Sequence, residues 1–198
     1  MYDETKWQAF IQQCKSSKKR FIMTLLVVHQ DFRRAETSHV NALLIDTKQQ
    51  QMERLEPQGQ QILVDDDDLE QAHRYLEQIS MPAFARGLGF SYLSPIKFCP
   101  KDGPQSLQYD EVNGDEDVGF CAHWALWYLH LRLEYPDVPP QELIQRAIIS
   151  LQKQGGRRPL HNFIRDYARF FEQFRSRLEA SPEDIEALAS QFVQARRI

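Results

Sequence analysis

The sequence has few of the features that direct a chain to a membrane or to the secretory pathway. It has only three cysteines among 198 residues, and their wide spacing fits neither a disulfide framework nor a CxxC metal site. No stretch approaches the roughly eighteen apolar residues of a membrane span, and no basic segment leads into an apolar one at the N-terminus. We therefore expect a cytoplasmic protein with no membrane partner, metal or other cofactor. Delivery into a host cell as an effector stays compatible, because specialised export signals need not resemble a cleavable leader.

Positive charge is also scarce. The 24 Lys and Arg residues are outnumbered by 28 Asp and Glu residues, and the formal net charge is −4. The one basic cluster, residues 15–20, is predicted to be a solvated turn before a strand. We expect no nucleic-acid partner, because such partners require a concentrated basic surface. With 42% hydrophobic residues, the chain can build one substantial core, so residues 1–198 are predicted to form a single domain.

The apolar pattern predicts an α+β fold, a small mixed or antiparallel sheet packed on a central helix that begins at Cys121. The domain core is expected over about residues 21–134, with a C-terminal helical extension over about 140–198. Strand and helix periodicities predict the following elements: a helix over 5–14, a central strand over 21–28, an antiparallel strand pair over 42–46 and 52–56, a short strand over 90–93, a loop over 99–105, and helices after Cys121 that include 142–154, 160–178 and 182–197. The aspartates at 65–68 are predicted to cap a helix that starts at Leu69.

Cys121 follows Gly119 and Phe120 and lies in the first turn of the predicted central helix. Backbone N–H groups at a helix start are unpaired and carry partial positive charge, so they favour a thiolate and lower the thiol pKa. Cys99 is the rival nucleophile, but it lies in a predicted loop where its reactivity should be that of an ordinary thiol. Cys14 is predicted to pack within the N-terminal helix. Cys121 is therefore the candidate nucleophile.

A catalytic thiolate needs a base and a group that orients the base. His39 begins one predicted strand and Glu56 ends its antiparallel partner, so the two should lie side by side at one end of the sheet. Strand alternation points Asn41 to the same face as His39, without assigning it a role. Glu53 competes for the acid role, but its position beside Arg54 favours a surface ion pair.

This order of histidine, acid, glutamine and cysteine resembles the clan of cysteine peptidases that contains the adenovirus protease and the SUMO and ubiquitin-like-protein proteases. Residues 55–59, Leu-Glu-Pro-Gln-Gly, are similar to the acidic segment of the adenovirus enzyme, and residues 119–122, Gly-Phe-Cys-Ala, to the glycine-flanked cysteine that opens the clan's central helix. The chain is also similar to proteins of large DNA viruses, and to bacterial relatives, that carry a His-x-Asn hairpin, a Glu-Pro-x-Gly turn and a Gly-aromatic-Cys-Ala-x-Trp helix. The resemblance spans about residues 21–134.

By this resemblance His39 would be the general base, Glu56 its orienting acid and Cys121 the nucleophile. Gln105 would be an oxyanion donor together with the backbone N–H of Cys121, and Gln108 is the alternative. Both glutamines lie further from the cysteine than in those families, which an insertion over the intervening residues would explain.

A second departure concerns the residue after the histidine, which is Val40 here and commonly tryptophan in those families. The resemblance implies a thiol protease, a deubiquitinase or SUMO-type isopeptidase that cleaves after the C-terminal glycine of ubiquitin or a ubiquitin-like modifier through an acyl-thioester. Two alternatives remain open. YopJ-type acetyltransferases use the same triad but need a basic phosphoinositol pocket, for which the chain offers only Arg157 and Arg158. A non-catalytic protein-binding module would not need the intact triad.

Overall fold

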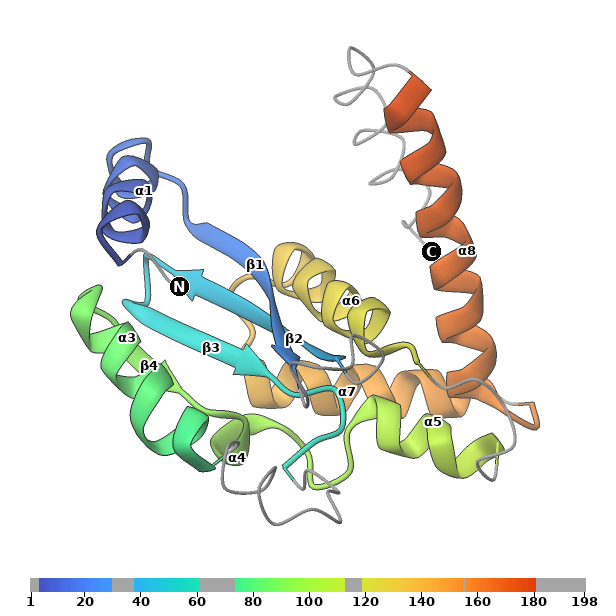
Figure 1. Ribbon diagram of the computed structural model, residues 1–198. Coiled ribbons are helices and arrows are strands. Elements are labelled where there is room, and N and C mark those ends of the chain that lie inside the picture. Colours follow the sequence, from blue (N-terminus) through green and yellow to red (C-terminus); the bar gives the residue numbers. More distant parts are fainter. Residues whose placement is uncertain (1–3, 30–37, 61–73, 113–118, 155, 181–198) are drawn as a thin grey trace.

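The computed structural model describes residues 4–29, 38–60, 74–112, 119–154 and 156–180, which form one sheet with helices on both faces (Figure 1). The sheet has the order β1-β2-β3-β4. Its strands are β1 (Phe21–His29), β2 (Ser38–Asp46), β3 (Gln51–Leu55) and β4 (Ser91–Leu93). The β1–β2 and β2–β3 pairs are antiparallel, whereas β3 and β4 are parallel. The predicted α+β class with a mixed sheet is confirmed.

Eight helical elements accompany the sheet in the described residues, and the last of them is the longest. In chain order the helices are α1 (Glu4–Ser16), the π-helical turn η2 (Leu76–Ser80), α3 (Met81–Gly87), α4 (Pro95–Phe98), α5 (Pro104–Val112), α6 (Cys121–Glu134), α7 (Pro140–Lys153) and α8 (Pro159–Ala180). None of the helices within the described ranges is long and apolar enough to cross a membrane. The aspartates at 65–68, the start of their predicted helix and the predicted helix over 182–197 lie outside the described residues.

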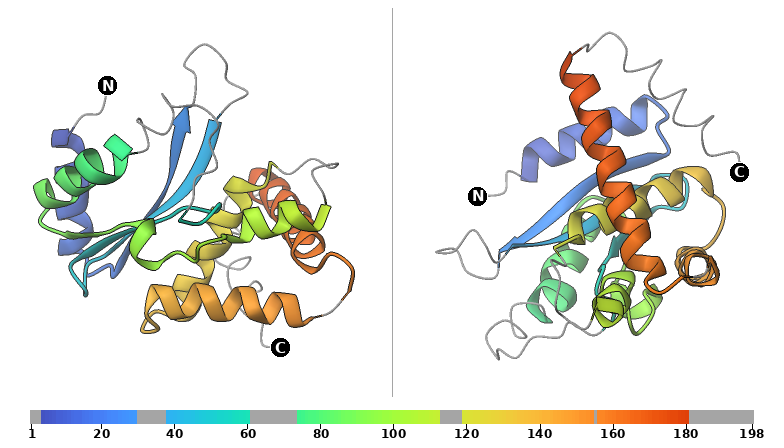
Figure 2. Two further views of the ribbon diagram at one scale, coloured as in Figure 1. Left: turned by 90° about the horizontal axis from the view of Figure 1, so that it is seen from below. Right: turned by 90° about the vertical axis from the view of Figure 1, so that its right-hand side faces the viewer.

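The core lies on both faces of the sheet, because successive residues of β2 alternate between them. Ala42 and Leu44 belong to a buried cluster with residues of α6, α7 and α8. Leu43 and Ile45 belong to a second cluster with Ile11 of α1 and residues of α3. Figure 2 shows this layering, with α1 and α3 on one side of the sheet and α6 and α7 on the other. Two covered faces explain why the strand sequence reads as a nearly continuous apolar run.

The prediction that residues 21–28 form a central strand is wrong. In the described sheet β1 is an edge strand that pairs with β2, with Phe21 opposite Asp46. Its apolar sequence arises from burial rather than from a second neighbour. Ile22 is buried in the cluster with α1, whereas Met23 and Leu25 pack against the cluster with α6. Where an edge strand packs against helices on both faces, as at residues 22–25, it has the same hydrophobic pattern as a central one.

The turn after β3 is held against the start of α5. Gln105 N donates to the Pro57 carbonyl at 3.0 Å, and Gly103 N donates to the Gln58 carbonyl at 2.7 Å. A Cβ atom at Gly103 would overlap the Pro57 carbonyl, so the approach requires glycine. The predicted loop over 99–105 therefore ends earlier than expected, because α5 begins at Pro104. This contact places α5 beside the end of β3.

Candidate active site

The site lies at the end of the sheet where β2 begins, β3 ends and α6 starts (Figure 1). The antiparallel register pairs Ala42 with Leu55, so Asn41 and Glu56 follow as neighbours at the next position. His39 lies beyond the β2–β3 pairing but remains paired with Val28 of β1. His39 therefore lies at the end of the sheet, where Glu56 follows β3.

His39 and Glu56 form a short, buried pair. His39 Nε2 and Glu56 Oε1 are 2.5 Å apart, and the two residues are 6% and 1% exposed. Glu56 also accepts from Asn41 Nδ2 at 2.7 Å and from Gln58 N at 3.0 Å. Burial raises the pKa of Glu56, but the hydrogen bond and charge of His39 and the charge of Arg54 outweigh it and lower the pKa. The carboxylate is therefore ionised, and His39 Nε2 donates to it.

The imidazole of His39 also interacts with Cys121. His39 and Cys121 shift each other's pKa through their side chains, and because Nε2 faces Glu56, Nδ1 is the ring nitrogen left for the sulfur. Burial lowers the pKa of His39, but hydrogen bonds to Cys121 and Glu56 more than offset it and raise the pKa to about 9. Burial raises the pKa of Cys121, but the hydrogen bond and charge of His39 and backbone hydrogen bonds at Val40 and Ala122 lower it overall. The arrangement favours an imidazolium beside a thiolate.

Cys121 is the first residue of α6, after Phe120 at the N-cap, and it is half-buried. The helix packs on β2, so the packing of an apolar helix against the sheet sets the position of the sulfur. The rival Cys99 is 2% exposed, and burial raises its pKa to about 12. The expectation of ordinary reactivity for Cys99 is therefore wrong, because its thiol is held neutral in the core. Cys14 lies on α1, on the other face of the sheet.

Glu53 does not form the predicted surface pair with Arg54. It is 1% exposed, and its Oε1 accepts from Arg132 Nε at 2.7 Å and from the Tyr128 hydroxyl at 3.1 Å, both on α6. Neighbouring residues of a strand face opposite ways, so Arg54 points to the other side and donates to Asn41 Oδ1. The carboxylate within reach of the histidine is that of Glu56.

Both candidate oxyanion donors lie on α5, one helical turn apart. Gln108 is fully buried, and its Oε1 accepts from Trp124 Nε1 at 2.9 Å, one turn along α6 from Cys121. Gln105 is less buried, and its backbone is fixed to the turn after β3. Within the described part of the chain, Gln105 Oε1 and Gln108 Nε2 are buried without a hydrogen-bond partner. The assignment of either glutamine as oxyanion donor stays a prediction.

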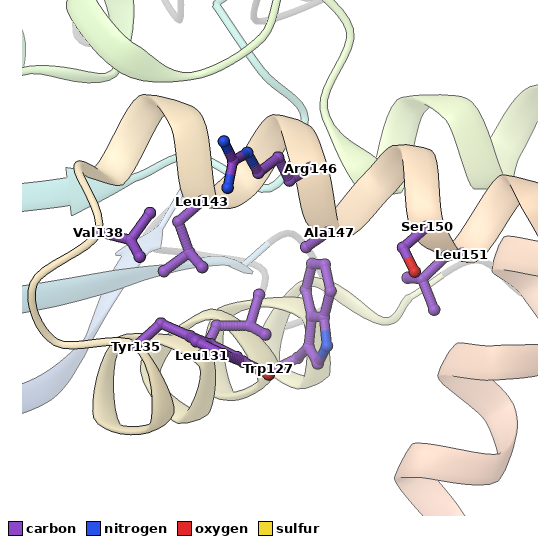
Figure 3. Close-up of a pocket in the computed structure, with 9 residues that line it drawn as sticks. All are labelled: Trp127, Leu131, Tyr135, Val138, Leu143, Arg146, Ala147, Ser150 and Leu151. Carbon is purple, nitrogen blue, oxygen red and sulfur yellow. The ribbon is translucent and has the colours of Figure 1, made fainter. Parts of the chain in front are cut away.

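A separate apolar cavity of about 310 Å³ lies between α6 and α7 (Figure 3). Its lining includes Trp127, Leu131, Leu143 and Ala147, with Arg146 at its rim. It contains none of the predicted site residues and lies towards the other end of α6 from Cys121. Across the described ranges, no group of three or more His, Cys, Asp or Glu residues is placed to hold a metal ion.

The comparisons with known proteins return one viral relative. No family model matches the sequence, and no solved structure matches it. A protein of Acanthamoeba polyphaga mimivirus, described by its name as an ankyrin repeat protein, is 29% identical over 150 residues. The match covers 70% of this chain and 19% of the viral protein, so the chain spans about a fifth of that relative's length.

Proposed function

We propose that this chain is a cysteine peptidase in which Cys121 is the nucleophile, His39 the general base and Glu56 the acid that orients the base. The observation that carries the proposal is the buried His39–Glu56 pair, 2.5 Å apart, together with the influence of His39 that lowers the pKa of Cys121. Strongly shifted pKa values with a specific charge partner are typical of catalytic groups.

The mechanism follows from the positions of the protons. The Cys121 thiolate attacks the scissile carbonyl carbon, and the resulting oxyanion is stabilised by the Cys121 backbone N–H and the amide of Gln105 or Gln108. The His39 imidazolium then protonates the leaving amine, the C–N bond breaks, and an acyl-thioester remains. Neutral His39 removes a proton from water, which attacks the thioester, releases the carboxylic acid product and restores the thiolate. Glu56 holds the ring in one tautomer throughout.

The proposed substrate is a protein, ubiquitin or a ubiquitin-like modifier such as SUMO. This preference draws on the order and sequence context of His39, Glu56 and Cys121, which are similar to the clan that processes such modifiers. A role limited to protein binding is the competing proposal, and the name of the viral relative is compatible with it. Buried ionised groups are costly to maintain, however, and a binding module has no use for them at this position.

The experiment is covalent labelling of the full chain with ubiquitin and SUMO probes that carry an electrophile at the C-terminus. We expect a slower-migrating adduct in the wild type and in the control Cys14→Ser, and none in Cys121→Ala. An adduct that persists in Cys121→Ala contradicts the assigned nucleophile. Failure of both probes, with autoacetylation from acetyl-CoA, would replace hydrolysis by acyl transfer. A folded protein inert in both assays would favour the binding role.

A further inference from the structure

The buried guanidinium of Arg54 is linked to the triad through Asn41. Arg54 is fully buried, and its donors reach three partners from three elements of the fold. It donates to Asn41 Oδ1 of β2, its Nε donates to the Tyr92 hydroxyl of β4 at 3.2 Å, and it forms an ion pair with Glu77 of η2. The Tyr92 hydroxyl also donates to Glu77 at 2.9 Å, which closes the cluster. A buried cation is tolerated only when it is paired in this way.

Asn41 connects this cluster to the triad. It is fully buried, its Oδ1 faces Arg54, and its Nδ2 donates to Glu56 Oε2 at 2.7 Å. An asparagine side chain has one accepting and one donating end, and arginine can only donate. Arg54 therefore allows a single orientation of the amide. The flipped amide would place its oxygen against the carboxylate and its NH₂ group against the guanidinium, so two favourable contacts would become two repulsive ones.

The fixed amide in turn sets the plane of the Glu56 carboxylate. Its Oε2 is held by Asn41, and its Oε1 is left to His39 and to the backbone N–H of Gln58. Rotation of the carboxylate would break all three contacts together. The direction of the His39 hydrogen bond is thus determined by a residue that does not contact the imidazole.

We propose that Asn41 and Arg54 are positioning residues: Arg54 fixes the amide of Asn41, and Asn41 fixes the carboxylate that orients His39. The inference rests on the proposed peptidase function, in which Glu56 orients the base. It adds a path of contacts that runs from Arg54 of β3, through Asn41 of β2, to Glu56 and His39. Tyr92 and Glu77 anchor Arg54 but lie off the path between Arg54 and the triad.

The test measures the reactivity of the Cys121 thiolate, which requires no substrate. The alkylation rate of Cys121 by iodoacetamide is followed by peptide mass spectrometry between pH 5 and pH 9, in pH steps of about one-half unit, a range chosen to bracket an ordinary thiol pKa of about 8.5. The variants are Asn41→Ala and, as a matched control, Tyr92→Phe, which removes a buried hydrogen bond of Arg54 but leaves its bond to Asn41. Circular dichroism checks folding, and Asn41→Ser, whose hydroxyl is too short to reach Glu56, replaces Asn41→Ala if the latter does not fold.

We expect Asn41→Ala to move the midpoint of the Cys121 alkylation profile upward by about one pH unit, which is a rate about tenfold lower at pH values below both midpoints. Tyr92→Phe should lower the melting temperature without changing the pH profile. In a Glu56→Gln background, the effect of Asn41→Ala should disappear, because Asn41 acts through that carboxylate.

The outcomes separate this inference from the proposed function. If wild-type Cys121 alkylates like an ordinary thiol, the proposed peptidase chemistry fails. If the wild type is reactive but Asn41→Ala leaves the profile unchanged, the positioning role is wrong. The same conclusion follows if Asn41→Ala has an undiminished effect in the Glu56→Gln background, or if Tyr92→Phe shifts the profile equally.

Discussion

Replacement of Glu56 by glutamine tests the acid of the triad with almost no change of shape. The carboxylate is 1% exposed and accepts three hydrogen bonds, of which the one from His39 is 2.5 Å long. A hydrogen bond to a charged group contributes about 1.5–3 kcal/mol, and a neutral one contributes about 0.5–1.5 kcal/mol. The imidazolium therefore loses about 1–2 kcal/mol of stabilisation, which lowers the pKa of His39 by about one unit.

The assay is the pH dependence of kcat/KM. The pKa of Cys121 is lowered and that of His39 is raised to about 9, so both groups are charged between the two values and the profile should be bell-shaped. The acidic limb reports thiolate formation. The basic limb, near pH 9, reports loss of the imidazolium that protonates the leaving amine. In Glu56→Gln the midpoint of the basic limb should move to lower pH by about one unit, and the maximum of kcat/KM should fall by about 10²- to 10⁴-fold.

Glu53→Gln is the matched control, because Glu53 is equally buried and lies three residues earlier on β3 but faces α6. It should lower the stability of the protein and leave the basic limb in place. The reasoning is refuted if Glu56→Gln leaves the limb of the wild type unchanged, or if Glu53→Gln moves it as far.

Three further predictions concern the framework of the site. Gly103→Ala should lower the free energy of unfolding by about 1–3 kcal/mol, because the added Cβ overlaps backbone atoms. Gly89→Ala, whose Cβ meets no atom within 4 Å, should lower it by only about 1 kcal/mol because of the positive φ of Gly89. Equal losses in denaturant unfolding would contradict the steric argument. Trp124→Phe removes the donor to buried Gln108 and should lower the free energy of unfolding by at least about 1–3 kcal/mol, and an unchanged denaturant midpoint would contradict this. Cys99→Ala should leave probe labelling intact, because burial raises the pKa of the Cys99 thiol to about 12. Loss of labelling in a folded variant would indicate that Cys99 is the nucleophile.

The main elements of the fold could be predicted because local pattern determines them. The apolar run of β2, the turn between β2 and β3, and the helical period after Cys121 each give a signal within a few residues. The antiparallel geometry of one strand pair was sufficient to expect His39 and Glu56 at the same sheet end, where the structure places them. The start of α6 could be predicted because a glycine and an apolar run flank it.

The remaining features depend on contacts between distant segments. Glu53 looked like a surface residue because its partner, Arg132, lies 79 positions away on α6. Arg54 lies two residues before Glu56, so strand alternation predicts that the two side chains share a face. The partner of Arg54, Glu77, could not be predicted, because nothing in the sequence indicates that η2 packs over this part of the sheet. The edge position of β1 was missed because packing of residues 22–25 against helices on both faces gives the same apolar pattern whether or not a strand has two neighbours.

The central claim is that His39 lowers the pKa of Cys121 and so favours its thiolate. Its most direct test is the pH profile of Cys121 alkylation, measured by peptide mass spectrometry in the wild type and in His39→Ala. The account predicts a midpoint below the ordinary thiol value of about 8.5 in the wild type, and an upward shift in His39→Ala. A wild-type midpoint at the ordinary value, or a profile that His39→Ala leaves unchanged, would contradict it.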